Sequence, residues 1–306
     1  MIIITVCATK GGVGKTTTTA NVGALFADMG LRVLMVDADP QPALTQHFVI
    51  KNRAPHGLTE IIKRGTVTAD CISTLEIPPA NTTLQRLPKL NPNGCLDLIA
   101  SDSPQGEIQD WLANRIDRPV RMKQALRSPI LADNYDVVLV DTQGAVGHLQ
   151  DAAILAADLL LSPVATDVIS AREFLNRTIA LLDRLEDGAI MGIKVPPMKA
   201  VTYKTQRTKD SRAISNVIRE AFLSLRGRVS IMDCSVPDAV AYRDAATAQV
   251  PVHWVDPIKA SDTLHRLAWE LLPNLEGVRT TDVSHEAPES VSTEADLGEE
   301  DEQVQS

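Results

Sequence analysis

The sequence is poor in aromatic side chains and has no long hydrophobic segment. Phe, Trp and Tyr together make up 3% of the 306 residues, which leaves few rings for stacking on nucleic-acid bases. Uninterrupted apolar runs of ~18 residues, the length that spans a bilayer, are absent, so we expect no membrane span. The chain enters an apolar segment at Ile2 without a charged leader, so we expect no export signal.

Cysteine is scarce as well. The four cysteines, Cys7, Cys71, Cys95 and Cys234, form no C-x-x-C pair. This pattern favours reduced, mostly structural thiols in a cytoplasmic protein. An iron–sulfur cluster held by a cysteine pair at a dimer interface is the alternative. It is disfavoured because the cysteines lie outside the motifs described below.

The C-terminal segment contains no basic residue. Residues 281–306 hold nine acidic residues and no Lys or Arg, which accounts for the whole formal net charge of −9 and leaves a neutral body. Such a segment buries too little apolar surface to fold alone. We therefore predict an acidic disordered tail at 278–306 behind a folded domain at 1–277. The tail either keeps the protein soluble or competes with nucleic acid for a basic surface.

A glycine-rich loop lies between a strand and a helix near the N-terminus. The β-branched run Ile2–Val6 predicts a buried strand, and Val22, Leu25, Phe26 and Met29 form one apolar helix face. Between them, residues 9–17 read T-K-G-G-V-G-K-T-T, and we call this segment the phosphate loop. Its glycines allow main-chain N–H groups to face an anion at the positive end of a helix. The pattern therefore predicts a nucleotide site with Mg²⁺.

The roles within the loop follow from charge and position. Lys15 brings a positive charge to the β- and γ-phosphates, and the Thr16 hydroxyl is placed to hold Mg²⁺. The first glycine of the ordinary P-loop pattern is replaced by Thr9, and Lys10 precedes a double glycine. The predicted nucleotide-binding residues of the loop are Lys10, Gly11, Gly12, Val13, Gly14, Lys15, Thr16 and Thr17.

This form of the loop resembles the deviant Walker A motif of the ParA/MinD/Soj class of ATPases. The resemblance spans about Met1 to Leu275. It implies ATP and Mg²⁺ as ligands and an ATP-dependent homodimer, in which Lys10 reaches across to the ATP of the other subunit. It also implies catalytic roles for Lys10 and Lys15.

Two acidic residues follow the next predicted strand, Leu31–Val36. The sequence Asp37-Ala38-Asp39-Pro40-Gln41 places carboxylates at a strand end, where an open parallel sheet binds its ligand. It resembles the switch I signature of the same class. The resemblance implies that Asp37 orients the attacking water and that Asp39 supports Mg²⁺.

A third acidic residue ends the strand Tyr135–Val140. Asp141 completes a Walker B pattern and is predicted to hold a Mg²⁺-bound water. Thr142-Gln143-Gly144 follows as a candidate switch II. The strand at Leu96–Ser101 resembles the L-x-L-I-P-S strand of the class, with Ala100 in place of the usual proline.

Strands and helices alternate along the rest of the chain. Residues 152–157 and 170–183 are predicted helices, and 159–164 is a buried strand. This alternation predicts an α/β fold, a mostly parallel twisted sheet with helices on both faces. A helix near Asp262–Leu272 is followed by Pro273 and the acidic tail. This context favours core packing over membrane anchoring.

A basic stretch interrupts the neutral body at 199–228. This stretch contains eight Lys and Arg residues and two acidic residues, which gives a local net charge of +6. This predicts nonspecific binding to double-stranded DNA, and a solvated helix face is the alternative. The predicted DNA-binding residues are Lys204, Arg207, Lys209 and Arg212. Pro237 is the candidate residue over the adenine.

These features together predict a ParA-type DNA-partition ATPase. By resemblance, the ATP dimer binds DNA, associates with the nucleoid in the cytoplasm and is released when a ParB-like centromere-binding protein stimulates hydrolysis. No membrane partner is expected. The alternatives are a MinD-like positioning ATPase and a nucleotide-gated scaffold with little turnover.

Overall fold

The protein is described by a computed structural model. It describes residues 1–84, 86–88, 90–103, 106–144, 146–165, 168–187, 194–205, 227–280 and 284–286.

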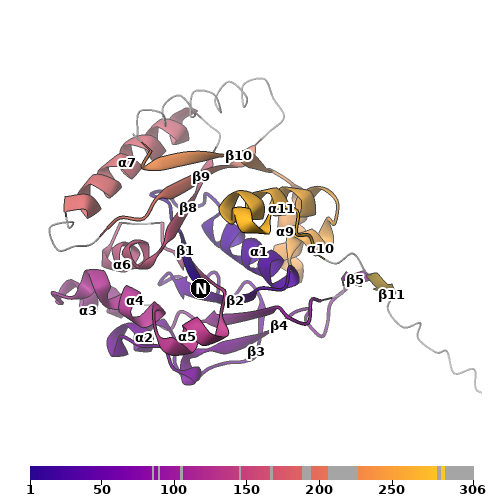
Figure 1. Cartoon of the computed structure of the whole chain (residues 1–306), viewed down its shortest axis with the longest axis horizontal. Helices are drawn as coiled ribbons and strands as arrows, with labels where there is room; N and C mark the ends of the chain where they lie inside the picture. The colour runs from indigo at the N-terminus through magenta and orange to yellow at the C-terminus, as the bar shows by residue number, and fades with distance from the viewer. Residues whose placement is uncertain are drawn as a thin grey trace, which may run out of the picture.

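A nine-stranded sheet forms the centre of the molecule (Figure 1). Seven neighbouring strands pair in parallel, whereas β4 is antiparallel to both β6 and β3. The prediction of a mostly parallel sheet is confirmed. From one edge to the other, the strands are β10 (Val229–Pro237), β9 (Met198–Thr205), β8 (Leu159–Ala165), β1 (Ile2–Val6), β7 (Val137–Thr142), β2 (Arg32–Ala38), β6 (Cys95–Ile99), β4 (Ser73–Glu76) and β3 (Val49–Asn52).

Helices cover both faces of the sheet, as the near-continuous apolar strands require. Each face has its own hydrophobic core. One face carries α1 (Lys15–Asp28), α9 (Val240–Ala248), α10 (Val252–Val255) and α11 (Lys259–Leu271) (Figure 1). The other carries α2 (Leu58–Arg64), α3 (Glu107–Ala113), α4 (Arg118–Leu126), α5 (Pro129–Asn134), α6 (His148–Ala156) and α7 (Val168–Glu186).

The chain changes direction along the sheet at β1. From β1 it crosses through α1 to β2 on one side, and from β7 it crosses through α6 to β8 on the other. In open parallel sheets, such a switch point forms a crevice at the carboxyl ends of the strands, where ligands bind. This topology places the loop after β1 at the centre of that crevice.

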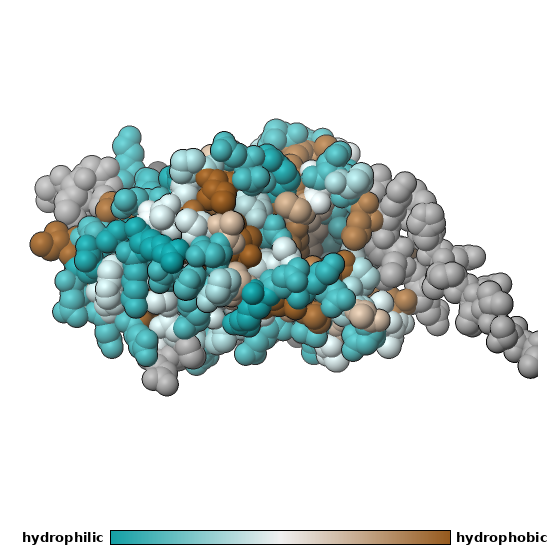
Figure 2. All heavy atoms as spheres, turned by 90° about the horizontal axis from the view of Figure 1, so that it is seen from below, coloured by the Kyte–Doolittle hydropathy of each residue, from teal (hydrophilic) through white to brown (hydrophobic). Residues whose placement is uncertain are grey.

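The predicted last helix is α11, and it packs into a core. Leu264, Leu267, Ala268 and Leu271 are all buried, so the core-packing interpretation is confirmed. Within the described ranges, no helix is both long and hydrophobic enough to cross a membrane. Figure 2 shows one face of the molecule, on which hydrophobic residues form separate spots among hydrophilic ones.

The cysteines are free thiols, and Cys7, Cys71 and Cys234 are buried in the two cores. In the part of the chain with described coordinates, no group of three or more His, Cys, Asp or Glu could hold a metal ion.

Little of the predicted tail lies within the described residues. Residues 278–280 attach to α11, where Trp269 Nε1 donates to Val278 O (2.9 Å) and Thr280 N donates to His265 Nε2 (3.1 Å). Further on, β11 (Ser284–Glu286) pairs with β5 (Arg86–Pro88) in a two-stranded antiparallel sheet. Residues 281–283 and 287–306 lie outside the description, so the disordered tail stays a prediction.

Candidate functional site

The phosphate loop presents an open helix N-terminus. Gly12 and Gly14 have φ of 73° and 92°, values that favour glycine, and Gly14 is the N-cap of α1. The cap makes no side-chain hydrogen bond, and the first turn contains no acidic residue. The first N–H groups of α1 and the positive end of its dipole therefore remain available for an anion.

The two lysines of the loop differ in exposure. Lys15 is only 8% exposed, and its charge lowers the pKa values of Cys7 and Asp141 against the effect of burial. Lys10 is exposed, as are the neighbouring Gly11 and Gly12. The buried lysine thus belongs to the interior of the site, and the exposed one lies on its outer surface.

The predicted magnesium pair is brought together across 125 residues of sequence. Thr16 Oγ1 donates to Asp141 Oδ2 at 2.6 Å, and Thr19 Oγ1 lies 3.4 Å from Asp141 Oδ1. Asp141 is fully buried, and this burial raises its pKa to about 7, a shift that the Thr16 bond and Lys15 oppose. A buried carboxylate beside a hydroxyl supplies the hard oxygen ligands that Mg²⁺ prefers.

Asp37 lies beside Asp141 on the neighbouring strand, because β2 and β7 pair in register at these two residues. Asp37 is fully buried, and its Oδ2 accepts hydrogen bonds from Thr45 N (2.7 Å) and Thr45 Oγ1 (2.6 Å). Among the described residues, its Oδ1 has no partner. Burial raises the pKa of Asp37 to about 6. Oδ1 therefore retains unused acceptor capacity, although the atom is itself buried.

Asp39 lies on the partly exposed loop that follows β2. Its Oδ1 accepts from Gln41 N at 2.9 Å, and its carbonyl oxygen accepts from Ser101 Oγ at 2.7 Å. Ser101 N also donates to Thr45 Oγ1 at 3.0 Å. Ser101, which follows β6, therefore holds both the loop that carries Asp39 and the Thr45 side chain that binds Asp37.

The candidate switch II residues lie against the phosphate loop. A Cβ on Gly144 would lie 2.9 Å from Gly11 Cα, so only glycine permits this approach. Gln150 on α6 is fully buried, and its Nε2 donates to Ala8 O (3.1 Å) and Gln143 O (3.2 Å). The sequence analysis missed Gln150, since no motif contains it.

The remaining predicted residues lie further from the loop or outside the description. Pro237 is the last residue of β10. It lies at the carboxyl ends of the strands, as the phosphate loop does, but β10 is three strands away from β1. Arg207, Lys209 and Arg212 are outside the described residues, and only the backbone of Lys204 is described, in β9.

The local charge of +6 at 199–228 is partly compensated. Arg228 Nη1 lies 2.6 Å from Asp183 Oδ1 and 3.1 Å from Glu186 Oε2, and Lys199 Nζ donates to Glu270 O. Both basic residues of this stretch whose side chains are described therefore make internal contacts.

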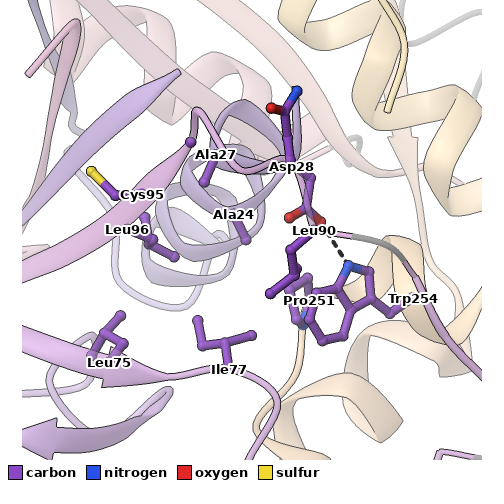
Figure 3. Close-up of a pocket in the computed structure, with 12 residues that line it drawn as sticks. Ala24, Ala27, Asp28, Leu75, Ile77, Leu90, Cys95, Leu96, Pro251 and Trp254 are labelled. Carbon is purple, nitrogen blue, oxygen red and sulfur yellow. Dashed lines mark hydrogen bonds between the residues drawn. The ribbon is translucent and has the colours of Figure 1, made fainter. Parts of the chain in front are cut away.

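A pocket of about 130 Å³ lies at the other end of α1 (Figure 3). Asp28 and Trp254 on its wall are joined by a hydrogen bond, Trp254 Nε1 to Asp28 Oδ2, of 2.7 Å. Most of the lining is apolar: it consists of Ala24, Ala27, Asp28, Leu75, Ile77, Leu90, Asn91, Gly94, Cys95, Leu96, Pro251 and Trp254. None of the predicted site residues lines it.

Known sequences resemble most of this chain. A family model described as "AAA domain" matches residues 1–189. An uncharacterized protein of Mycobacterium tuberculosis is 28% identical over 278 residues, covering 88% of this chain and 78% of that protein. The chromosome partitioning protein ParA of Myxococcus xanthus is 28% identical over 252 residues (82% and 80%). The sporulation initiation inhibitor protein Soj of Bacillus subtilis is 33% identical over 162 residues (53% and 57%).

Solved structures share the fold. McdA of Cyanothece in complex with ATP, as a variant, has a TM-score of 0.68 at 23% identity, covering 89% of this chain and 96% of that chain. The septum site-determining protein MinD of Pyrococcus horikoshii, complexed with Mg-ADP, has a TM-score of 0.62 at 17% identity (92% and 99%).

Proposed function

The chain belongs to the AAA domain family, and we propose that it is a ParA-type positioning ATPase that partitions DNA. Its ATPase domain would span 1–277. The name of the relative ParA, a chromosome partitioning protein, supports partition, and the ligands of the fold neighbours support ATP and Mg²⁺. In the cytoplasm, the ATP-bound homodimer would bind DNA of the nucleoid nonspecifically. A ParB-like partner would stimulate hydrolysis and release it.

One observation carries this proposal: Thr16 Oγ1 meets the buried Asp141 carboxylate at 2.6 Å, directly at the open N-terminus of α1. The donor set fits a magnesium nucleotide, because it combines N–H donors for phosphate with hydroxyl and carboxylate oxygens for Mg²⁺. Bound Mg²⁺ would neutralise phosphate charge during transfer. Thr16, Asp141 and Asp39 are the residues that would hold it.

The protein's part in hydrolysis is to position groups and to balance charge. The buried Lys15 would neutralise charge on the phosphates within its own subunit. The exposed Lys10 would reach the nucleotide of the other subunit in the dimer. Asp37 would orient the attacking water through Oδ1, with Oδ2 fixed by Thr45. Pro237 would lie over the adenine.

DNA binding would use the basic residues between β9 and β10. Lys199 and Arg228 make internal contacts; of the other six basic residues in this stretch, Lys204, Arg207, Lys209 and Arg212 are the proposed set. Lysine and arginine that contact phosphates release counterions, so the affinity falls as salt rises. The acidic tail would compete weakly for the same surface.

The experiment is DNA binding at several salt concentrations, with and without ATP. Replacing Arg207, Lys209 and Arg212 together by Ala should weaken binding to every DNA sequence and flatten the salt dependence. The matched control replaces the exposed Lys51, Arg53 and Lys63 by Ala, which changes the net charge equally and should have little effect. Binding by the first variant at the wild-type level would contradict the DNA surface. DNA binding that does not depend on ATP would favour a MinD-like positioning role.

A further inference from the structure

A tyrosine outside the nucleotide motifs packs directly on the phosphate loop. Tyr203, near the carboxyl end of β9, is 5% exposed and belongs to the core on the α1 face. A Cβ on Gly14 would lie 2.3 Å from both Cε1 and Cζ of Tyr203. The ring therefore touches the N-cap of α1, and any side chain at this glycine would displace it.

The same tyrosine holds the loop at a second point. Its hydroxyl interacts with the side chain of Thr17, and this interaction lowers the pKa of Tyr203 against the larger, raising effect of burial. Gly14 and Thr17 are three residues apart at the start of α1, so they lie on the same side of the helix. One rigid side chain thus fixes the left-handed N-cap and the last threonine of the phosphate loop.

Tyr203 also faces the loop that follows β10. The carboxylate of Asp238, next to Pro237, raises the pKa of Tyr203 in addition to the larger effect of burial. Tyr203 in turn raises the pKa of Tyr242 on α9, a residue that is itself largely buried. In the sheet, Tyr203 pairs with Val236, and Tyr242 packs against the core that contains Tyr203, so this residue lies near the start of the segment 237–242 as well as near α1.

We propose that Tyr203 is a positioning residue for phosphate binding, which acts through Gly14 and Thr17 and touches neither the reacting atoms nor the base. The inference rests on the proposed nucleotide function. With the ring removed, the N-cap could leave its left-handed conformation and the Thr17 hydroxyl could rotate. The N–H groups of the loop would then have to be ordered by the ligand itself, which weakens binding.

This role predicts a loss of affinity with little change in turnover. Tyr203→Leu should weaken ADP binding at least about tenfold, since preorganisation is lost, while kcat at saturating ATP stays within about threefold. Tyr203→Phe keeps the ring on Gly14 and loses only the bond to Thr17, so we expect an intermediate loss of about threefold to fivefold. Inorganic tripolyphosphate, which has no base, should lose affinity by the same factor as ADP.

The matched control is Tyr135→Phe. Tyr135 is equally buried, and its hydroxyl donates to Asp97 Oδ2 at 2.8 Å, so this variant also removes one buried hydroxyl bond, away from the loop. It should bind ADP like the wild type. Binding is measured by titration calorimetry and by competition with tripolyphosphate.

Three results would overturn the inference. If Tyr203→Leu and Tyr203→Phe bind ADP like the wild type, Tyr203 is an ordinary core residue, while the proposed function stands. If the loss affects ADP but not tripolyphosphate, Tyr203 contacts the base instead. If the wild type itself binds no ADP, the proposed function fails and the inference fails with it.

Discussion

The two ends of α1 both carry buried polar groups, but they satisfy them differently. At the C-terminal end, Asp28 Oδ2 accepts from Trp254 Nε1 and pairs with His253 Nε2, each at 2.7 Å. At the N-terminal end, the cap makes no side-chain bond and Lys15 is buried beside Asp141. At the C-terminal end, other side chains of the protein thus satisfy the Asp28 carboxylate. The N-terminal end instead presents its hydrogen-bond donors to a ligand.

The pocket lies at the satisfied end. Its walls are mostly apolar, and its carboxylate already has two donors. Hollow space alone therefore does not locate the chemistry of this molecule. The uncapped N-terminus at the other end of α1 locates it, because its N–H groups and the helix dipole favour an anion.

The largest effect should come from the N-terminal end. Lys15→Ala removes the buried positive charge, so we expect nucleotide affinity to fall at least about 1,000-fold, or about 4 kcal/mol, with the fold intact. Lys10→Ala changes an exposed lysine of the same loop. It should leave the nucleotide affinity of the monomer unchanged but prevent ATP-dependent dimerisation. Calorimetry and size-exclusion chromatography with a nonhydrolysable analogue measure the two effects. Equal loss of binding in both variants would contradict the division of roles.

The C-terminal end should affect stability alone. Asp28→Ala leaves two buried donors without an acceptor, which should cost about 2–3 kcal/mol and lower Tm by about 5–10 °C. Its affinity for ADP, measured below the lowered Tm, should stay within about twofold, since the two ends are separated by about 20 Å of helix. A loss of affinity comparable to that of Lys15→Ala would show that the two ends are not independent.

Asp141 should show a conflict between function and stability. Because burial raises its pKa to about 7, its ionised form is disfavoured in the folded protein, and stability falls as pH rises through the window from about 4 to 7. Asp141→Asn should therefore stabilise the protein by about 2 kcal/mol at pH 8 with magnesium chelated, and abolish hydrolysis. Thermal unfolding tests this. Asp136→Asn is the control, because Arg32 lowers the pKa of that surface carboxylate, so no stabilisation is expected.

The smallest effect concerns His47, on the loop between Asp37 and β3. Burial lowers its pKa to about 4, so the unfolded chain binds a proton first as pH falls below about 6.5. Its contribution to stability is full above that value and is lost between about 6.5 and 4. At pH 5.5, His47→Gln should therefore raise the free energy of unfolding by about 1 kcal/mol. His56→Gln, a control at an exposed position, should show no such gain. Parallel Tm profiles of the two variants would contradict this.

The sequence predicted those parts of the site that are continuous in the chain. The phosphate loop, the switch I aspartates and Asp141 each lie at or just after the carboxyl end of a strand, so strand pattern and spacing were enough to find them. Thr16 and Asp141 were predicted to share one ion, and they do meet at 2.6 Å.

The supporting side chains could not be predicted in the same way. Tyr203 and Gln150 contact the site because the order of strands in the sheet brings distant segments together. Single-sequence patterns carry no information about such pairs. The strands β3 and β4 were also missed, since each has four residues and only Ser73 among them is buried, a pattern that resembles a loop.

The most direct test of the account is phosphate release from ATP by the purified protein, compared with Asp37→Ala. Asp37 binds Thr45 through Oδ2 and has no partner at Oδ1 among the described residues, so its proposed role is to orient water, and the variant should bind ATP like the wild type. It should hydrolyse it at least about 100-fold more slowly, since the water loses its orientation. A wild type that releases no phosphate with Mg²⁺, DNA and its partner present, or a variant that turns over at the wild-type rate, would contradict the account.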